Sequence, residues 1–231
     1  MERHFERELE DLKGNLVTMG SLVDGQLGSA CRALFEGDLA RARDVMERDR
    51  EVDSFDTLID RQCMDILALA QPVAVDLRLL MSSLAINSQL ERIGDIAVNI
   101  AERVEPLVAH REFLLSTRLS EMANIARIMV RDSLDSFIHG EASLASRVLV
   151  SDDVVDRLDG GLFRSLVAEM TDRHDRIEAA AHILILSRHL ERLADHATNI
   201  AEDVIFIVEA KLVKHNAGEG IRPWQSRRFQ A

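Results

Sequence analysis

Apolar residues recur every three or four positions over most of the chain, which is the spacing of one face of an α-helix. The first such run extends from about residue 5 to residue 35. Its apolar positions are Leu9, Leu12, Leu16, Met19, Val23, Leu27, Cys31 and Leu34. This pattern predicts a long amphipathic helix with one buried face.

Turn-forming residues divide the rest of the first half into two more helices. Gly37-Asp38 joins a residue that tolerates a left-handed backbone to a helix-capping carboxylate. Gln71-Pro72 is the next break, because proline disfavours a helical residue before it and fits the first turn of a helix. We therefore expect helices at about 38–69 and 72–109, with Pro106 ending or bending the second of them.

The same pattern then restarts in the second half. Ser116-Thr117 can cap a fourth helix that ends near Ile138, and Gly140-Glu141 repeats the break at Gly37-Asp38. The fifth helix is expected at about 141–170, with Gly160-Gly161 as a weak point. Thr171-Asp172 can cap a sixth helix over about 172–214.

No segment shows the alternation of a β-strand more strongly than a helical period, and three prolines in 231 residues leave little room for an all-β fold. Equivalent positions recur about 100 residues apart, which is much longer than a solenoid unit. We therefore predict an all-α fold of two tandem three-helix bundles related by duplication. The expected domains are 1–110 and 111–216, followed by a basic tail at 217–231 that contains Trp224 and Phe229.

The net negative charge of the chain argues against some classes of binding partner. A net charge of −12 and a pI near 5.1 argue against nucleic acid and against anionic lipid, both of which need Lys and Arg for binding. No apolar run of 18 residues and no signal peptide are present, so we expect no membrane insertion. Cys31 and Cys63 lie in helical patterns without motif spacing, which is typical of reduced, buried thiols in the cytoplasm.

The most distinctive stretch of the chain occurs twice, as ERIGDIAVNIAERV at 91–104 and ERLADHATNIAEDV at 191–204. At about 100° per helical residue, Glu102, Asp95 and Asn99 lie about 20°, 40° and 80° from Glu91. The second copy repeats this row with Glu191, Asp195, Asn199 and Glu202. Each copy thus places three carboxylates and a carboxamide on one narrow helix face, where like charges repel.

The apolar residues upstream of the first row share its face. These residues are Leu77, Leu80, Met81 and Leu84. We therefore expect this face to be a core stripe at one end of the helix and to become rich in oxygen at the other.

A second acidic pair accompanies each row. Asp49 and Asp53 lie four residues apart on the second expected helix, and Asp152 and Asp156 repeat this pair on the fifth. Neighbouring helices pack about 8–10 Å apart, so the pairs and the rows can converge into oxygen sites for a hard cation. From the residues alone, a solvated face or one paired with Arg92 and Arg192 is an equally open reading.

Enzyme chemistry finds little support in the motifs. The paired Glu-x-x-His signature of di-iron bundles is absent, and the first copy has Ile96 at the position equivalent to His196. Neither a Ser/Cys-His-Asp grouping nor a glycine-rich phosphate loop can be recognised. A metal-dependent hydrolase or oxidase built on the same carboxylates stays as a minor alternative, and an interaction scaffold without metal as another.

At this point the residues resemble the PhoU family of phosphate-transport accessory and regulatory proteins. The resemblance covers about residues 3–212, and its most specific marks are LERIGDIAVNIAE and LERLADHATNIAEDV. It implies two three-helix bundles and metal clusters, iron or zinc in some members, on the paired acidic motifs. The positions that match these motifs are Asp49, Asp53, Glu91, Asp95, Asp152, Asp156, Glu191 and Asp195, with Asn99, Glu102, Asn199, Glu202 and Asp203 as auxiliary ligands.

The resemblance also implies a function that is not enzymatic. Family members act as negative regulators between the ATPase subunit of the phosphate ABC transporter and the phosphate-sensing histidine kinase, in the cytoplasm and often as homodimers. They reach the membrane only through these partners. The metal is left open among Fe, Zn, Mg, Mn and Ca, since oxygen-only ligands suit Mg²⁺, Ca²⁺, Mn²⁺ or ferric iron better than Zn²⁺.

Overall fold

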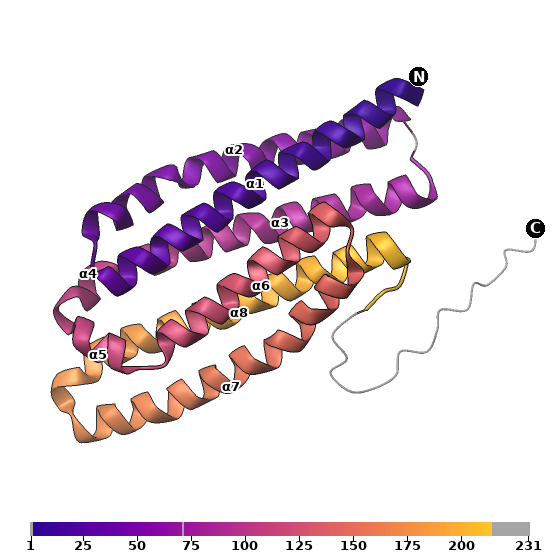
Figure 1. Ribbon diagram of the computed structural model, residues 1–231. Helices are drawn as coiled ribbons and strands as arrows, with labels where there is room; N and C mark the ends of the chain where they lie inside the picture. The colour runs from indigo at the N-terminus through magenta and orange to yellow at the C-terminus, as the bar shows by residue number, and fades with distance from the viewer. Residues whose placement is uncertain (1, 71, 214–231) are drawn as a thin grey trace, which may run out of the picture.

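The chain forms two antiparallel bundles of three long helices, joined by a short helical connector (Figure 1). The computed structural model describes residues 2–70 and 72–213, so the expected tail at 217–231 lies outside the described residues. The first bundle contains α1 (Glu2–Glu36), α2 (Leu39–Ala70) and α3 (Ala74–Glu102). The second contains α6 (Leu119–His139), α7 (Ala142–Asp172) and α8 (Ile177–Glu209). The predicted fold is therefore confirmed.

The glycine breaks end the first helix of each bundle as expected. Gly37 and Gly140 have φ angles of 73° and 65°, in the left-handed region that residues with a Cβ rarely adopt. Asp38 then caps α2, because its Oδ1 accepts a hydrogen bond of 3.0 Å from the backbone N–H of Arg41. A left-handed glycine therefore turns the chain at equivalent places in both halves, whereas Glu141, at the position of Asp38, makes no side-chain cap hydrogen bond.

The two bundles meet along two helix pairs. Seen as in Figure 1, α1 and α6 lie in front and α3 and α8 lie behind them. Helices α3 and α8 run antiparallel, as the hydrogen bond from Ser82 Oγ to Asp203 Oδ1 (3.4 Å) and the 2.8 Å contact of His196 Nδ1 with Gln89 Oε1 show. This register brings the first residues of the two motif copies, near 91–94 and 191–194, together at the contact of α3 with α8.

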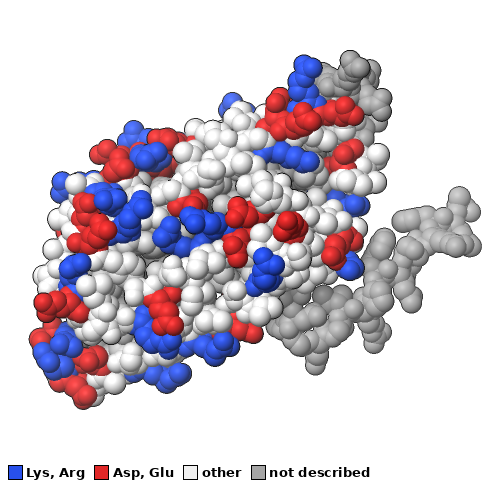
Figure 2. All heavy atoms as spheres, viewed as in Figure 1, with Lys and Arg blue, Asp and Glu red and all other residues white. Residues whose placement is uncertain are grey.

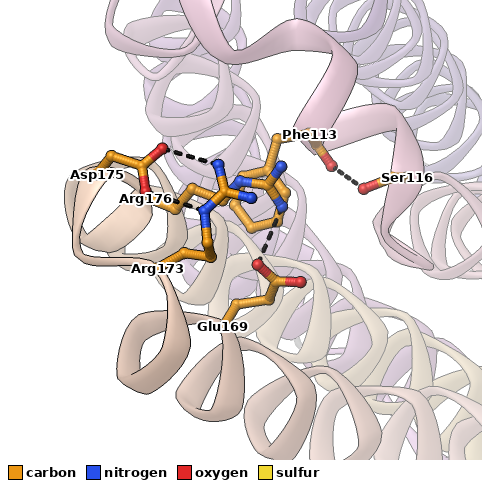
Figure 3. Close-up of polar contacts among 6 residues, drawn as sticks. All are labelled: Phe113, Ser116, Glu169, Arg173, Asp175 and Arg176. Atoms are coloured by element: carbon orange, nitrogen blue, oxygen red, sulfur yellow. Dashed lines mark hydrogen bonds and ion pairs between the residues drawn. The ribbon is translucent and has the colours of Figure 1, made fainter.

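A connector between the bundles replaces the expected end of the third helix. Helix α3 ends at Glu102, and α4 (Val104–Leu107), η1 (Val108–His110) and α5 (Arg111–Ser116) follow. Phe113 of α5 lies 4.8 Å below the guanidinium of Arg176, which also forms an ion pair of 3.0 Å with Glu169 (Figure 3). This contact holds the connector against the turn between α7 and α8.

Thr171 and Asp172 do not cap the sixth helix as the sequence suggested. Both belong to the last turn of α7, where Thr171 Oγ1 donates to the backbone carbonyl of Val167 at 2.9 Å. A short 3₁₀ turn, η2 (His174–Arg176), then leads into α8. The prediction was wrong because a Thr hydroxyl satisfies an i−4 carbonyl inside a helix as readily as it caps the next one.

The expected core stripe upstream of Glu91 is also wrong in part. Leu80 is fully buried, but Leu77 and Met81 are 39% and 51% exposed, and Leu84 is half-buried. The helical period correctly places these residues near one face of α3. That face borders α2 and solvent along its whole length, whereas the core of α3 lies on the side of Ile86 and Ile93.

Two further predictions from the sequence concern the state of the cysteines and insertion into a membrane. Cys31 and Cys63 are free and buried, as expected, and burial raises the pKa of these thiols to about 11 and 12. Within the described residues, no helix has the length and apolar character needed to cross a bilayer. The face seen in Figure 2 carries acidic and basic side chains interspersed among uncharged ones.

Candidate functional site

A row of aspartates on α2 faces the repeated motif on α3. Asn87 fixes the register of the two helices, because its Nδ2 donates to Asp56 Oδ1 at 2.8 Å and to Asp60 Oδ1 at 3.1 Å. One and two turns further along, Asp53 and Asp49 of α2 come opposite the motif acids. We call this set the first acidic cluster; it consists of Asp49, Asp53, Asp56, Asp60, Glu91 and Asp95.

The carboxylates of the first acidic cluster are close enough to perturb one another. Burial, then Asp95 and Asp56, raise the pKa of Glu91. Burial, then Asp49 and Asp53, raise the pKa of Asp95. The like charges therefore meet across the boundary between α2 and α3, as the sequence predicted for the motif pairs, and their repulsion makes the ionised state costly.

Gln26 of α1 supports Asp49 from behind. Its Nε2 donates to Asp49 Oδ1 at 3.0 Å and to the backbone carbonyl of Val45 at 3.2 Å. Its own Oε1 is buried without a hydrogen-bond partner. A methyl group at Gly94 would lie 3.6 Å from both Asp49 Oδ1 and Gln26 Oε1, so the motif glycine leaves room beside these oxygens.

The second acidic cluster has the same plan with different details. It consists of Asp152, Asp156 and Asp159 of α7 and Glu191 and Asp195 of α8. Burial, then Asp195, raise the pKa of Glu191, which repeats the behaviour of Glu91. Asp152 is buried on α7, whereas its counterpart Asp49 is half-buried.

One cation distinguishes the second acidic cluster from the first. Arg188 Nη1 lies 2.9 Å from Asp159 Oδ2 and 3.9 Å from Glu191 Oε1, and Ser187 Oγ donates to the other oxygen of Asp159 at 2.6 Å. The residue equivalent to Arg188 in the first half is the exposed Ser88. In the described part of the chain, no Lys or Arg nitrogen forms such an ion pair with a member of the first acidic cluster.

Arg92 and Arg192 lie between the two clusters at the contact of α3 with α8. The charge of Arg192 on α8 partly offsets the raised pKa of Asp95 on α3. Burial, together with both arginines, lowers the pKa of His196 to about 4. The two acidic clusters are thus separated by a strip of positive charge. The sequence left open that the acidic face is paired with Arg92 and Arg192. In the structure, these two guanidinium groups screen the carboxylates only at the edges of the clusters.

The auxiliary residues proposed from the sequence are more scattered. Asn199 Nδ2 donates to Gln89 Oε1 on α3 at 3.2 Å, and Asp203 accepts from Ser82, so both lie at the contact of α3 with α8. Glu102 is exposed and lies near His189 on α8, where its charge partly offsets the lowering of the His189 pKa by burial. Asn99 and Glu202 are half-buried on the ends of their rows.

Sequence reasoning missed Asp56 and Asp159, which stand among the causes that raise the pKa of Glu91 and Glu191. The signal was available, since Asp49, Asp53 and Asp56 continue a spacing of four and three residues along one helix face. The supporting role of Gln26 could not be found in this way, because it depends on how α1 packs against α2.

The donor set suits a hard cation in its chemistry, since each cluster offers only carboxylate oxygens. The buried Oε1 of Gln26 beside Asp49 is a further acceptor without a partner. Among the described residues, however, no group of three or more His, Cys, Asp or Glu side chains is gathered tightly enough to hold a metal ion.

The comparisons with known proteins agree on one family. The PhoU domain model matches residues 16–104 and again residues 119–204. A PhoU homolog described as a phosphate-specific transport system accessory protein, from Pseudomonas putida, is 37% identical over 93% of this chain and 84% of its own length. The corresponding homolog of Aquifex aeolicus is 38% identical over 90% of this chain and 95% of its own.

Solved structures show the same fold. The crystal structure of PhoU from Pseudomonas aeruginosa superposes with a TM-score of 0.84 at 36% identity, covering 90% of this chain and all of that one. The phosphate transport system regulatory protein PhoU from Streptococcus pneumoniae gives a TM-score of 0.83 at 29% identity, covering 91% of this chain and 99% of that one. The similarity therefore extends over both bundles.

Proposed function

The chain belongs to the PhoU family, and from that membership we propose that it restrains phosphate uptake and phosphate-starvation signalling when phosphate is plentiful. Its relatives are named as accessory proteins of the phosphate-specific transport system, which supports a role in regulating phosphate transport. This is the role of a regulatory protein that binds partners, not of an enzyme.

The proposed partners are the ATPase subunit of the phosphate ABC transporter and the phosphate-sensing histidine kinase. Contact with both would place the protein at the cytoplasmic side of the membrane, and a homodimer is the proposed assembly. A net charge of −12 and two partly exposed acidic clusters support binding to basic surfaces of such partners.

The same clusters are proposed to bind metal ions. The observation that carries this proposal is the raised pKa of two equivalent residues, Glu91 and Glu191, each caused by burial and by the acid one turn away. Two bundles that differ at many positions both keep this costly arrangement. A bound cation would remove the repulsion and bring the oxygens together.

The ligands follow from the contacts on each side. Asp49, Asp53, Glu91 and Asp95 would hold a cation in the first acidic cluster, with Gln26 orienting Asp49. Asp152, Asp156, Glu191 and Asp195 would do so in the second. Auxiliary ligands are proposed at Asn99, Glu102, Asn199, Glu202 and Asp203. The bound ion would supply a fixed positive charge to which an anionic group of a partner or ligand could bind.

A deletion strain tests the regulatory role. Without this protein, phosphate-starvation genes should be expressed even in high phosphate, and the wild-type chain should restore repression. Repression that persists in the deletion strain would remove the proposed role while leaving the fold intact. A variant with Glu91→Gln and Glu191→Gln, which keeps the side-chain size, should fail to restore repression if the clusters are needed.

A second candidate is an interaction scaffold that uses its carboxylates without metal. The absence of a tightly gathered ligand group among the described residues favours it. In that case, partner binding would depend on the acidic charge but not on chelators. Partner binding measured with and without EDTA separates the two functions, because only the metal-binding regulator should respond to the chelator.

A further inference from the structure

The first acidic cluster continues into an exposed apolar surface. One turn beyond Asp60 on α2 comes Met64, which is 58% exposed, and on α3 the register set by Asn87 places Met81 opposite it. We call this surface the first apolar patch; it consists of Met64, Leu67, Leu77, Met81 and Leu84. The boundary between α2 and α3 is therefore apolar at one end and acidic at the other.

This boundary is open on the side that faces away from α1. In the described part of the chain, α1 and α3 are the long helices that pack closely against α2. Helix α2 lies at the edge of the molecule away from the second bundle (Figure 1). A further helix packed along the outer side of α2 and α3 would complete a four-helix bundle with the first three.

The acidic end of this surface carries charge that the protein itself balances only at the edge. Within residues 2–70 and 72–213, no carboxylate of the first acidic cluster forms an ion pair with Lys or Arg. The charge of Arg92 offsets only part of the rise in the pKa of Glu91, which burial, Asp95 and Asp56 cause. Cationic side chains of a partner would relieve the repulsion among these acids.

The dimensions of the surface suit one helical segment. Met64 and Asp49 are fifteen residues apart on α2, which corresponds to about 22 Å at 1.5 Å per residue. A partner helix of about fifteen residues therefore covers both ends at once. Apolar side chains at helical spacing anchor such a helix, and the flexible side chains of Met64 and Met81 can adapt to them.

We propose that the first apolar patch and the first acidic cluster together dock a helical segment of another protein, apolar in one half and rich in Lys and Arg in the other. The apolar half packs on Met64, Leu77 and Met81. The basic half lies along the acids from Asp60 to Asp95. This inference goes beyond the proposed function, because it specifies a surface and the chemistry of its occupant, and it requires no bound metal.

The charge of the surface selects this occupant over two others. A second copy of the chain docked through the same surface would bring one first acidic cluster against another, and like charges in an interface repel. An anionic lipid surface would be repelled by the same carboxylates. A basic helical segment satisfies both the exposed apolar side chains and the acids beside them.

The second half of the protein keeps the apolar positions but changes the charge. Its exposed and half-buried apolar residues at equivalent positions form the second apolar patch, which consists of Phe163, Val167, Met170, Ile177 and Leu184. Phe163 stands where the first half has Asp60, and Arg188 stands where it has Ser88. Arg188 pairs with Asp159 at 2.9 Å. The same basic segment should therefore prefer the first surface.

Methionine methyl groups report on both surfaces in one experiment. In protein labelled with ¹³C at these methyls, Met64 and Met81 report on the first apolar patch and Met170 reports on the second. The probe is a synthetic fifteen-residue peptide with Leu at helical spacing in one half and Lys on the same face of the other half. The reversed sequence tests the opposite orientation. Titration in EDTA keeps metal away, so failure of docking and failure of metal binding can be distinguished.

We expect one of the two peptides to shift the Met64 and Met81 signals saturably while the Met170 signal moves much less. A peptide with Glu in place of Lys should not bind. Absence of a saturable shift at Met64 and Met81 up to about 1 mM peptide would overturn the proposal. Equal binding of the Glu peptide, or a stronger response at Met170, would also overturn it.

Matched variants test each end of the surface through the affinity for a fluorescently labelled peptide. Met64→Lys with Met81→Lys should weaken binding about 10-fold, because two exposed apolar contacts are lost. Ser88→Arg, which introduces the cation found in the second half, should weaken it about 5-fold. Phe163→Lys with Val167→Lys is the control and should leave the affinity unchanged.

All the positions changed in these variants are exposed, and circular dichroism verifies that each variant is folded. Equal weakening by the control pair, or unchanged affinity in both first-surface variants, would show that the peptide binds elsewhere and would refute the assigned surface.

Discussion

Gln26 donates a hydrogen bond of 3.0 Å to Oδ1 of Asp49, joining the buried face of α1 to the first acidic cluster. In the second half, the buried Met129 occupies the position of Gln26. The two clusters are therefore related in their carboxylates but differ in what holds them.

Replacing Gln26 should weaken metal binding in one half only. Gln26→Leu keeps the volume of the side chain but frees Asp49 to rotate, and loss of such a supporting contact typically costs about 10-fold to 100-fold in metal affinity. Calorimetric titration with Mn²⁺ should show the loss at one site, while Met129→Leu serves as the matched control. Equal weakening of both sites, or of neither, would show that this hydrogen bond does not position a ligand.

Metal binding should also weaken as the pH falls. Glu91, Asp95 and Glu191 have pKa values raised by burial and by neighbouring acids, so protons compete with a cation at a higher pH than they do at ordinary carboxylates. We expect the affinity for Mn²⁺ to decline from pH 7 toward pH 5. A flat profile over that range would mean that these acids are not ligands.

The carboxylate of Asp203 should make stability depend on pH. Burial raises its pKa from 3.8 to about 6, so the folded state binds a proton that the unfolded state has already released between these values. Stability is therefore highest below about pH 4 as far as this group is concerned, and it falls as the pH rises through 6. Asp203→Asn should stabilise the fold by about 1–2 kcal/mol at pH 7, after allowance for partial exposure, and have little effect below pH 4.

Urea denaturation at the two pH values checks this prediction. Asp203→Ser, which also removes the charge, should give the same direction of change at pH 7. Destabilisation by Asp203→Asn at pH 7 would indicate instead that the ionised carboxylate is needed by Ser82 or by an unidentified cation.

Inorganic phosphate should not bind to the metal-free protein. The exposed clusters carry negative charge that repels the phosphate anion, and a bound metal would be required to reverse that field. Calorimetry with phosphate after treatment with EDTA should give no heat of binding. Binding in the micromolar range would contradict the view that phosphate status reaches this protein through its partners.

The long helices could be predicted from the sequence because their burial follows one period over many turns. The breaks at Gly37 and Gly140 could also be predicted, because glycine readily adopts the left-handed backbone conformation that ends a helix. The connector at residues 103–118 could not be predicted, because its short helices depend on contacts such as Phe113 with Arg176. Periodicity placed Leu77 and Met81 near the face of Glu91 but could not tell that this face is exposed.

The acidic residues of the candidate site could be predicted from the sequence, but the residues that support them could not. Duplication and helical spacing identified the acids that face each other across α2 and α3, and across α7 and α8. The partners that distinguish the halves, Gln26 and Arg188, come from packing between helices and leave no local pattern. Asp56 and Asp159 follow Asp53 and Asp156 by three residues, so helical spacing could have identified them as well.

Metal titration of three proteins tests the central claim most directly. The wild type should bind Mn²⁺ at two sites. A variant with Asp53→Asn and Glu91→Gln should retain only the second site, and one with Asp156→Asn and Glu191→Gln should retain only the first. Binding that is absent from the wild type, or unchanged in both variants, would contradict the assignment of the two acidic clusters as metal sites.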